Sequence, residues 1–270
     1  MLRFVFLGNL VGEWIMPHTT PVAMVESWGR LIDWKARRVA ENGFLVESLQ
    51  HFDCNKVFDA SLGDGCDSIH LLQNGFSVVS NELDDGFIRK AQQNARANNV
   101  RLNVTSFDWR RLAKHFDDAS FDAVLCLGNS LTYLFKKKDR LLTLKNFWRL
   151  LKPGGLLLID ERNYVDMLRR KREMRAPGFA FKNKSVYRGK TIRVRPSHIS
   201  PAQVVLEYVD QLSGNTNTLH LYPFKKNELE NHLATTNFVV RKKLFDYRSR
   251  KNPFCEFISY VAQKPFDNFR

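Results

Sequence analysis

The chain has 270 residues, of which 44% are hydrophobic, enough for one large domain with a buried core. It has no run of about 18 apolar residues, so the sequence predicts no membrane-spanning helix. None of its four cysteines forms a Cys-x-x-Cys pair, which argues against a zinc site and favours a reducing, cytoplasmic setting. The net charge is +14, and residues 161–270 carry +12 of it, with 22 Lys and Arg against 10 Asp and Glu. This basic half leaves a nucleic acid, an anionic surface or an acidic substrate open as a partner.

Residues 1–24 are predicted to form an N-terminal arm, which ends in a stretch of Pro and Thr residues. Glu13 interrupts its apolar run, so a flexible or partner-binding arm is favoured over a signal peptide. From Val25 to Phe52 apolar residues recur at three- and four-residue spacing, which predicts helix. Asn42 and Gly43 are a candidate interruption of that helix.

Residues 57–60 predict a short buried strand, and Gly63 and Gly65 lie in the turn after it. A helix and a second strand follow, and Glu82 stands just past the second strand. Glycines followed by a carboxylate about 20 positions later are typical of a nucleoside-binding crossover, in which the carboxylate accepts hydrogen bonds from the ribose. Ser61 occupies the first glycine position of the dinucleotide motif. The turn therefore favours a ligand without a pyrophosphate, such as S-adenosylmethionine.

The rest of the chain continues the alternation of strands and helices. Strands are predicted at 100–106, 121–127 and 156–160, helices at 84–98 and 140–151, and a turn at Lys152-Pro153-Gly154-Gly155. This order predicts an α/β fold with a doubly wound, mainly parallel sheet. Residues 179–223 instead alternate between apolar and polar side chains, which predicts an antiparallel, β-rich insert that acts as a lid over the substrate site. A helix at 225–235 and two strands at 238–247 and 254–263 close the chain.

Four features together resemble the class I S-adenosylmethionine-dependent methyltransferases. They are the acidic strand-turn motif at 59–65, Glu82, the pair Asp108-Trp109, and Pro153-Gly154-Gly155. The resemblance implies a Rossmann-like methyltransferase fold that uses S-adenosylmethionine and no metal. Residues 25–178 and 224–270 would form the cofactor-binding domain, and residues 179–223 would be the insert.

A closer resemblance is to glycine N-methyltransferase and the related glycine/sarcosine N-methyltransferases. It is carried by residues 67–69 and 75–78, by the strand end Cys126-Leu127-Gly128-Asn129-Ser130, and by Asp160-Glu161-Arg162-Asn163-Tyr164. This resemblance runs from about Ile32 to Pro223. It implies methylation of the amine of glycine, sarcosine or dimethylglycine.

The resemblance also implies roles for particular residues. Arg37 would meet the carboxylate of the cofactor, Asp59, Ser61 and Gly63 would line its methionine part, Glu82 would hold the ribose, Asp108 and Trp109 would flank the adenine, and Leu127 would lie next to the sulfonium. The catalytic set comprises Asn129 and Arg162, which would bind the substrate carboxylate, and Tyr222, which would wall the same pocket. One departure from the family is Asp64, which stands where threonine is frequent and adds a negative charge near the methionine part.

Two other functions compete with this interpretation. An RNA or protein methyltransferase would use the basic C-terminal half, including the run Arg169-Arg170-Lys171-Arg172. A nucleic-acid substrate is not favoured, because the chain has no tetrad like Asn-Pro-Pro-Tyr. A cofactor-binding protein without catalytic activity is the third interpretation. The sequence does not fix the oligomeric state, so assembly of identical chains stays open.

Overall fold

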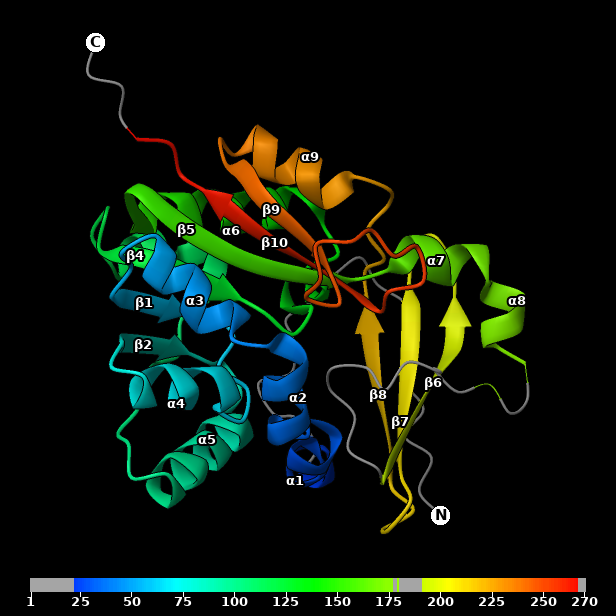
Figure 1. Cartoon of the computed structure of the whole chain (residues 1–270). Helices are drawn as coiled ribbons and strands as arrows, with labels where there is room; N and C mark the ends of the chain where they lie inside the picture. The colour runs from blue at the N-terminus through cyan, green and yellow to red at the C-terminus, as the bar shows by residue number, and fades with distance from the viewer. Residues whose placement is uncertain (1–21, 177–178, 180–190, 267–270) are drawn as a thin grey trace.

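The computed structural model describes residues 22–176, 179 and 191–266 (Figure 1). Its centre is a seven-stranded sheet with the strand order β3-β2-β1-β4-β5-β10-β9. All neighbouring strands from β3 to β5 are parallel, and β10 runs antiparallel to both β5 and β9. The prediction of a doubly wound, mainly parallel sheet is confirmed. The strands are β1 (Lys56–Asp59), β2 (Ser77–Asn81), β3 (Asn103–Thr105), β4 (Phe121–Cys126), β5 (Leu151–Arg162), β9 (Val239–Phe245) and β10 (Phe257–Gln263).

Helices cover both faces of this sheet because the central strands are apolar on both sides. On one face, side chains such as Val57 and Leu125 pack with α3 (Phe44–His51) and α4 (Cys66–Gln73). On the other face, Phe58 and its neighbours pack with α6 (Lys137–Leu150) and α9 (Glu228–Thr235). Successive residues of a strand therefore point into different cores. No helix among the described residues is long and apolar enough to cross a membrane.

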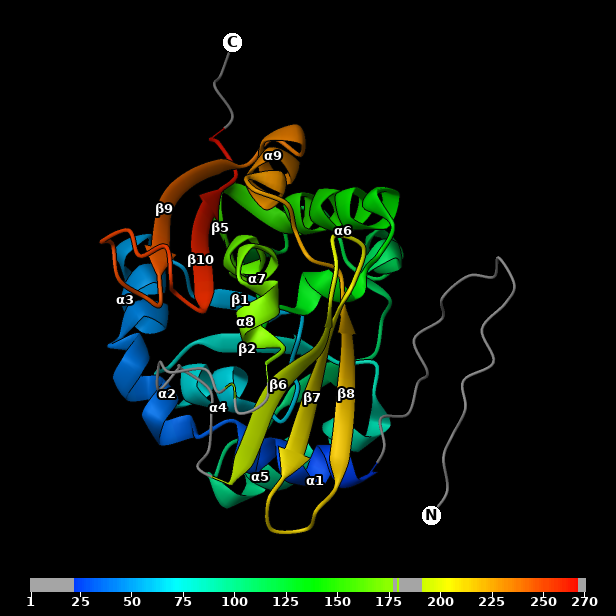
Figure 2. The ribbon, with the colours of Figure 1, turned by 90° about the vertical axis from the view of Figure 1, so that its right-hand side faces the viewer.

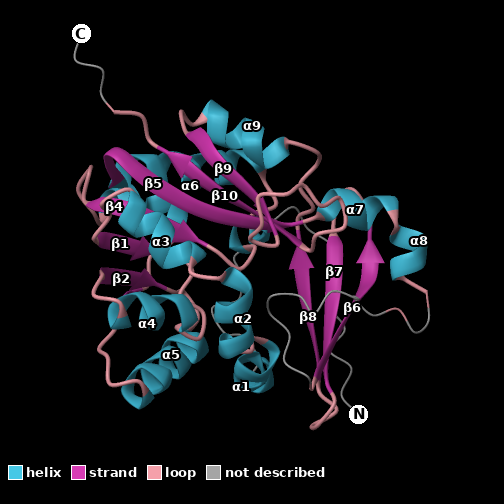
Figure 3. Cartoon of the chain, viewed as in Figure 1, coloured by secondary structure: helices cyan, strands magenta, loops and turns pink. Residues whose placement is uncertain are grey.

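The predicted antiparallel insert is present as a separate sheet of three strands. They are β6 (Ile192–Ile199), β7 (Val204–Asp210) and β8 (Thr216–Leu221), in the order β6-β7-β8. Figures 1 and 3 show this sheet beyond the end of β5 at which α7 (Tyr164–Arg169) begins. Its β7 strand alternates buried and half-buried residues, as a sheet with one covered face requires. Residues 180–190, predicted to begin the insert, lie outside the described part of the chain.

The helical stretch predicted from Val25 to Phe52 is three helices. They are α1 (Val22–Leu31), α2 (Trp34–Glu41) and α3. The break at Asn42 and Gly43 is confirmed, since both residues have left-handed backbones. The earlier break was not predicted. It arises at Asp33, whose carboxylate accepts a hydrogen bond from the Ala36 N–H and so starts a new helix. Residues 22–24, assigned to the arm, belong to α1, and residues 1–21 lie outside the described part.

The turn predicted at Lys152-Pro153-Gly154-Gly155 is instead an irregularity within β5. Phe121 pairs with Leu151 and Ala123 pairs with Leu156, so residues 152–155 lie opposite the single residue Asp122. The partner on the other side keeps this stretch extended. The Gly154 N–H donates to the Lys264 carbonyl and the Lys264 N–H donates to the Gly155 carbonyl, continuing the ladder beyond β10.

Short helices connect several strand ends to the next element. They are the 3₁₀ helices η1 (Trp109–Lys114) and η2 (Ser130–Tyr133), and the α-helices α7 and α8 (Lys171–Met174). None of them was predicted. A signal for α7 was present in the sequence, because Asn163 caps it by accepting a hydrogen bond from the Asp166 N–H.

The remaining helix, α5 (Asp85–Ala97), was predicted. It starts at its predicted cap, where the Asp84 carboxylate accepts a hydrogen bond from the Phe87 N–H.

Candidate functional site

The turn after β1 is fastened to the end of β4 through one serine. The Ser61 hydroxyl donates to the Leu127 carbonyl at 3.1 Å, and the Leu127 N–H donates back to the same hydroxyl at 3.2 Å. This reciprocal pair joins the carboxyl ends of two adjacent parallel strands. Ligands of open α/β sheets bind at such strand ends. The structure thus brings together Ser61 and Leu127, two residues predicted to line one ligand.

Glu82 lies at the same edge of the sheet, just after β2. Its carboxylate accepts hydrogen bonds from three backbone amides, those of Gly63 (3.0 Å), Leu83 (2.9 Å) and Asp84 (3.1 Å). Burial raises the pKa of Glu82, although these three donors favour its charged form. A carboxylate offers about four acceptor positions. One position therefore stays available in a carboxylate that the backbone holds rigidly.

The glycine turn closes tightly at Gly65, where α4 begins. The Gly65 φ is +93°, and a Cβ atom added there would meet Ile69 Cδ1 at 3.0 Å and Ala91 Cβ at 3.3 Å. Glycine is required both by the backbone and by the approach of α5. Gly75 provides a contrast, since its φ is +85° and nothing lies within 4 Å of its added Cβ.

We expect Gly65→Ala to lower the free energy of unfolding more than Gly75→Ala. Both variants carry the left-handed backbone cost of about 1–2 kcal/mol. Gly65→Ala adds the cost of overpacking, about 1–3 kcal/mol. Urea unfolding of the two variants measures the difference. Equal losses would show that the turn yields to a methyl group and that α5 does not confine it.

Two buried carboxyl groups flank this turn. Burial, reinforced by the nearby charge of Asp67, raises the pKa of Asp59 to about 7, although the Ser68 hydroxyl (2.6 Å) and the Ser61 N–H (3.1 Å) donate to it. Burial raises the pKa of Asp64 to about 6, and its carboxyl accepts from the Trp34 indole N–H at 3.1 Å. Both groups would ionise more readily beside a positive charge.

Arg37 is buried near the start of α4. It donates to the Asp67 carboxylate at 2.6 Å, and Arg38 pairs with the other oxygen of the same carboxylate. Burial alone would raise the pKa of Asp67, but the two guanidinium groups outweigh it and hold that pKa below its usual range. Arg37 is thus held next to the glycine turn by an acidic residue of α4, and its contact with the carboxylate of the cofactor stays a prediction.

Asp108 and Trp109 follow β3, as predicted, and are oriented by their own neighbours. Hydrogen bonds from the Arg110 guanidinium hold the pKa of Asp108 low, and the Arg110 N–H donates to the same carboxylate at 2.8 Å. The Trp109 indole N–H donates to the Ala60 carbonyl at 2.7 Å, and its ring meets Phe147 edge-on. Trp109 therefore contributes to the core and also fixes the position of the backbone just after β1.

Asn129 joins the ends of β4 and β5. Its side-chain oxygen accepts from the Arg162 N–H at 3.0 Å, and its amide group donates to the Thr132 hydroxyl at 3.0 Å. The Tyr164 hydroxyl lies 2.8 Å from the Asn129 side-chain nitrogen and 3.0 Å from its oxygen. Asp160 accepts from the Asn129 N–H at 2.5 Å, which supports a left-handed backbone with a φ of +66°. Asn129 and Arg162 are brought together as predicted. The contact joins the side chain of Asn129 to the backbone of Arg162.

The Arg162 guanidinium lies over the Phe257 ring, 4.6 Å from the ring centroid. Its charge opposes the rise that burial causes in the pKa values of two tyrosines, the half-buried Tyr133 and the buried Tyr164. Tyr208 of β7 acts on the same two hydroxyls. Arg162 and Tyr208 therefore both lie within electrostatic range of Tyr133 and Tyr164, which follow β4 and β5. Tyr133 and Tyr208 carried no sequence signal, because 75 positions separate them along the chain.

The Tyr222 hydroxyl makes its hydrogen bond to α9 and not to the residues around Arg162. It donates to the Glu228 carboxylate at 2.9 Å, and the Arg140 guanidinium lies 3.8 Å from the centroid of its ring. Arg140 also pairs with Glu228 at 3.1 Å. The backbone N–H of Tyr222 donates to the Thr132 carbonyl, which keeps the residue next to η2. The structure thus packs the Tyr222 ring against Arg140 of α6 and turns its hydroxyl toward Glu228 of α9.

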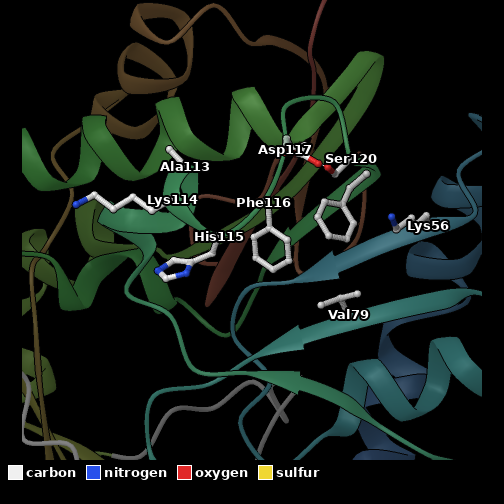
Figure 4. Close-up of a pocket in the computed structure, with 9 residues that line it drawn as sticks. Lys56, Val79, Ala113, Lys114, His115, Phe116, Asp117 and Ser120 are labelled. Carbon is white, nitrogen blue, oxygen red and sulfur yellow. The ribbon is translucent and has the colours of Figure 1, made fainter.

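A cavity of about 360 Å³ lies at a different edge of the sheet (Figure 4). Its lining includes Lys56 at the start of β1, Phe121 at the start of β4, and the stretch 113–117. Lys56 and Phe121 mark the amino ends of two parallel strands, opposite to the strand ends described above. None of the predicted site residues lines the cavity. No group of three or more His, Cys, Asp or Glu suited to a metal ion occurs in the described ranges.

Comparison with known proteins identifies the family of this chain. Residues 57–155 match the family model described as a methyltransferase domain. The chain is 34% identical over 242 residues to a glycine/sarcosine N-methyltransferase of Parasynechococcus marenigrum (strain WH8102), a match that spans 89% of this chain and 83% of that protein. A glycine/sarcosine N-methyltransferase of Halorhodospira halochloris is 30% identical over 243 residues, which are 90% of this chain and 87% of the relative.

The chain belongs to the glycine/sarcosine N-methyltransferase family. Among solved structures, an S-adenosylmethionine-dependent methyltransferase from Clostridium acetobutylicum ATCC 824 is similar, with a TM-score of 0.70 at 16% identity. That likeness covers 90% of this chain and 98% of the other, and it confirms the predicted class I methyltransferase fold. The predicted resemblance to this family and the prediction of a methyltransferase enzyme are likewise confirmed.

Proposed function

We propose that this methyltransferase transfers a methyl group from S-adenosylmethionine to the amine of glycine or of a methylated glycine. The observation that carries the proposal is the hydrogen bond from the backbone N–H of Arg162 to the side chain of Asn129. It joins the ends of two adjacent strands, next to Ser61 and Leu127, the proposed cofactor-binding residues. Membership in a family whose curated members are named for glycine and sarcosine supports the same substrate class.

We propose the following cofactor contacts. Glu82 accepts from a ribose hydroxyl at its remaining acceptor position, Asp108 and Trp109 flank the adenine, and Arg37 faces the amino-acid carboxylate. The turn from Asp59 to Gly63 and the Leu127 backbone line the methionine part. The hydrogen bonds between the Ser61 hydroxyl and the Leu127 backbone support this, because they join the turn to the end of β4. Bound S-adenosylmethionine supplies a methyl group on positively charged sulfur, which is an excellent leaving group.

On the substrate side, Arg162 binds the carboxylate and Asn129 assists it. A guanidinium presents a planar fork of donors that pairs with a carboxylate in two places, so it fixes both distance and direction. Asn129 holds the backbone of Arg162 and the hydroxyl of Tyr164, so it aligns the carboxylate site. The ring of Tyr222 forms part of the wall. In-line displacement by an unprotonated amine needs alignment more than a general base, so we assign no residue as a general base.

The insert at 179–223 acts as a lid on this site, and residues 25–178 with 224–270 form the cofactor-binding domain. The position of Tyr208 supports the lid, because this residue of β7 acts electrostatically on Tyr133 and Tyr164, as Arg162 does. An ion pair between Arg30 of α1 and Asp210 at the end of β7 fastens the insert to the N-terminal helices. The described residues contain four free cysteines, which supports the proposed cytoplasmic setting.

A screen with labelled S-adenosylmethionine tests the proposal. We expect glycine or one of its methylated forms to be labelled and glycinamide, which lacks the carboxylate, to react with a kcat/KM at least about tenfold lower. Bulk tRNA and rRNA serve as the comparison for the alternative substrate class. Equal labelling of the acid and the amide would refute the carboxylate clamp. Labelling of RNA in preference to the amino acids would favour the RNA methyltransferase.

A further inference from the structure

An exposed phenylalanine lies among arginines on the surface next to the candidate site. Phe254, in the loop between β9 and β10, is 53% exposed. The guanidinium groups of Arg169 and Arg170 lie 5.2 Å and 5.6 Å from its ring centroid. The Asn163 side chain also donates to the Pro253 carbonyl at 3.0 Å. The start of α7 therefore lies against residues 253–255, and the segments 164–175 and 246–256 that meet there are here called the basic-aromatic surface.

This surface is strongly positive. Both of its segments are described throughout, and they contain eight cationic side chains, six of them arginines: Arg169, Arg170, Lys171, Arg172, Arg175, Arg248, Arg250 and Lys251. The acidic side chains do not balance them. Asp166 is buried and pairs with Arg169 and Arg170, while Asp246 accepts from the backbone N–H groups of Glu256 and Phe257. Glu173 is the one exposed acid in these two segments.

The proposed reaction does not account for this charge. An amino acid substrate is a zwitterion, and S-adenosylmethionine carries a net positive charge, so a positive surface does not attract either of them from solution. The arginines also lie outside the strand-end cluster around Arg162. A polyanionic partner matches them better.

We propose that the basic-aromatic surface binds single-stranded nucleic acid as a partner and not as the methylated substrate. Arginine forks suit phosphate groups, and an exposed aromatic ring provides a stacking platform for an unpaired base. The surface fits an anionic membrane less well. Its large exposed apolar side chains are Phe254 and Val165, and its helices have six and four residues, too few for a helix that lies in a lipid interface.

Fluorescence anisotropy with a labelled oligouridylate of about 16 nucleotides tests the proposal across a salt series. The test variant is Arg172→Ser/Arg175→Ser/Arg250→Ser, and the matched control is Arg89→Ser/Arg96→Ser/Arg101→Ser on and just after α5, away from α7 and α8 (Figure 2). All six arginines are exposed. We expect the test variant alone to lose at least about tenfold in affinity. Its slope of log affinity against log salt should become shallower by about 2.

A second pair of variants separates stacking from charge. Phe254→Ala should weaken binding at least about fivefold at constant charge. Phe266→Ala, which removes another exposed phenylalanine, should leave the affinity unchanged. Equal losses in both arginine variants would refute the proposal. So would an unaffected Phe254→Ala variant, or parent protein that sediments with phosphatidylserine vesicles and does not bind the oligouridylate.

Glycine methylation provides the separate readout. The triple arginine variant should keep its turnover on the amino acid, and loss of turnover in a folded variant would place the surface in the substrate site and refute the proposal. If the parent bound the oligouridylate with the predicted dependence and methylated no amino acid, the proposed function would fail and the nucleic-acid surface would stand.

Discussion

Arg162→Lys is expected to lower kcat/KM for the amino acid by at least about tenfold, which corresponds to about 1.4 kcal/mol of transition-state stabilisation. Lysine keeps the positive charge and loses the planar fork, so both the affinity for the substrate and the orientation of its amine should be impaired. Binding of S-adenosylmethionine, measured by calorimetry, should change little. The backbone N–H that Asn129 accepts from is retained in the variant, so the link between β4 and β5 survives.

Arg172→Lys on α8 is the matched control, because it makes the same chemical change at an exposed position outside the proposed site. Its kcat/KM should equal that of the parent. The carboxylate clamp would be refuted by an Arg162→Lys enzyme with undiminished kcat/KM. It would also be refuted by equal turnover of amide and acid in the parent.

Glu82→Ala is expected to weaken S-adenosylmethionine binding by about 1–3 kcal/mol, the usual size for hydrogen bonds to a charged group. The variant removes the proposed acceptor of the ribose and also leaves three backbone amides without their carboxylate. Glu82→Gln separates the two effects, since it keeps the shape and one acceptor oxygen. Calorimetry gives the affinity, and thermal unfolding shows whether each variant is folded. Unchanged affinity in a folded Glu82→Ala protein would remove Glu82 from the site.

The elements that were predicted correctly from the sequence have local causes. Asp84 caps α5 through an N–H only three residues away, and Asn42 and Gly43 end one helix and start the next through their own backbone angles. The stretch at 152–155 was predicted incorrectly for a different reason. Its conformation depends on Lys264, more than a hundred positions later, whose backbone continues the ladder next to β5.

The same distinction applies to the site. Ser61 and Glu82 lie on one crossover unit, and the spacing of that unit alone placed them at one edge of the sheet. Tyr208 and Tyr222 both come from the region after β6, and the sequence offers no means of telling which hydroxyl faces Arg162. The structure places the Tyr208 hydroxyl near that cluster and the Tyr222 hydroxyl on Glu228. Only the packing of the insert decides between them.

The position of β10 between β5 and β9 has a consequence for how the chain folds as it leaves the ribosome. The parallel strands β1 to β5 can pair as soon as they have been made, but β9 pairs only with β10 and must wait for it. Phe257, against which Arg162 lies, belongs to that last strand. The proposed carboxylate site is thus completed only after β10 has been made and has paired with β5, about a hundred residues earlier in the chain. Until β10 pairs with it, β5 presents an unpaired strand edge, the kind of edge through which incompletely folded chains associate.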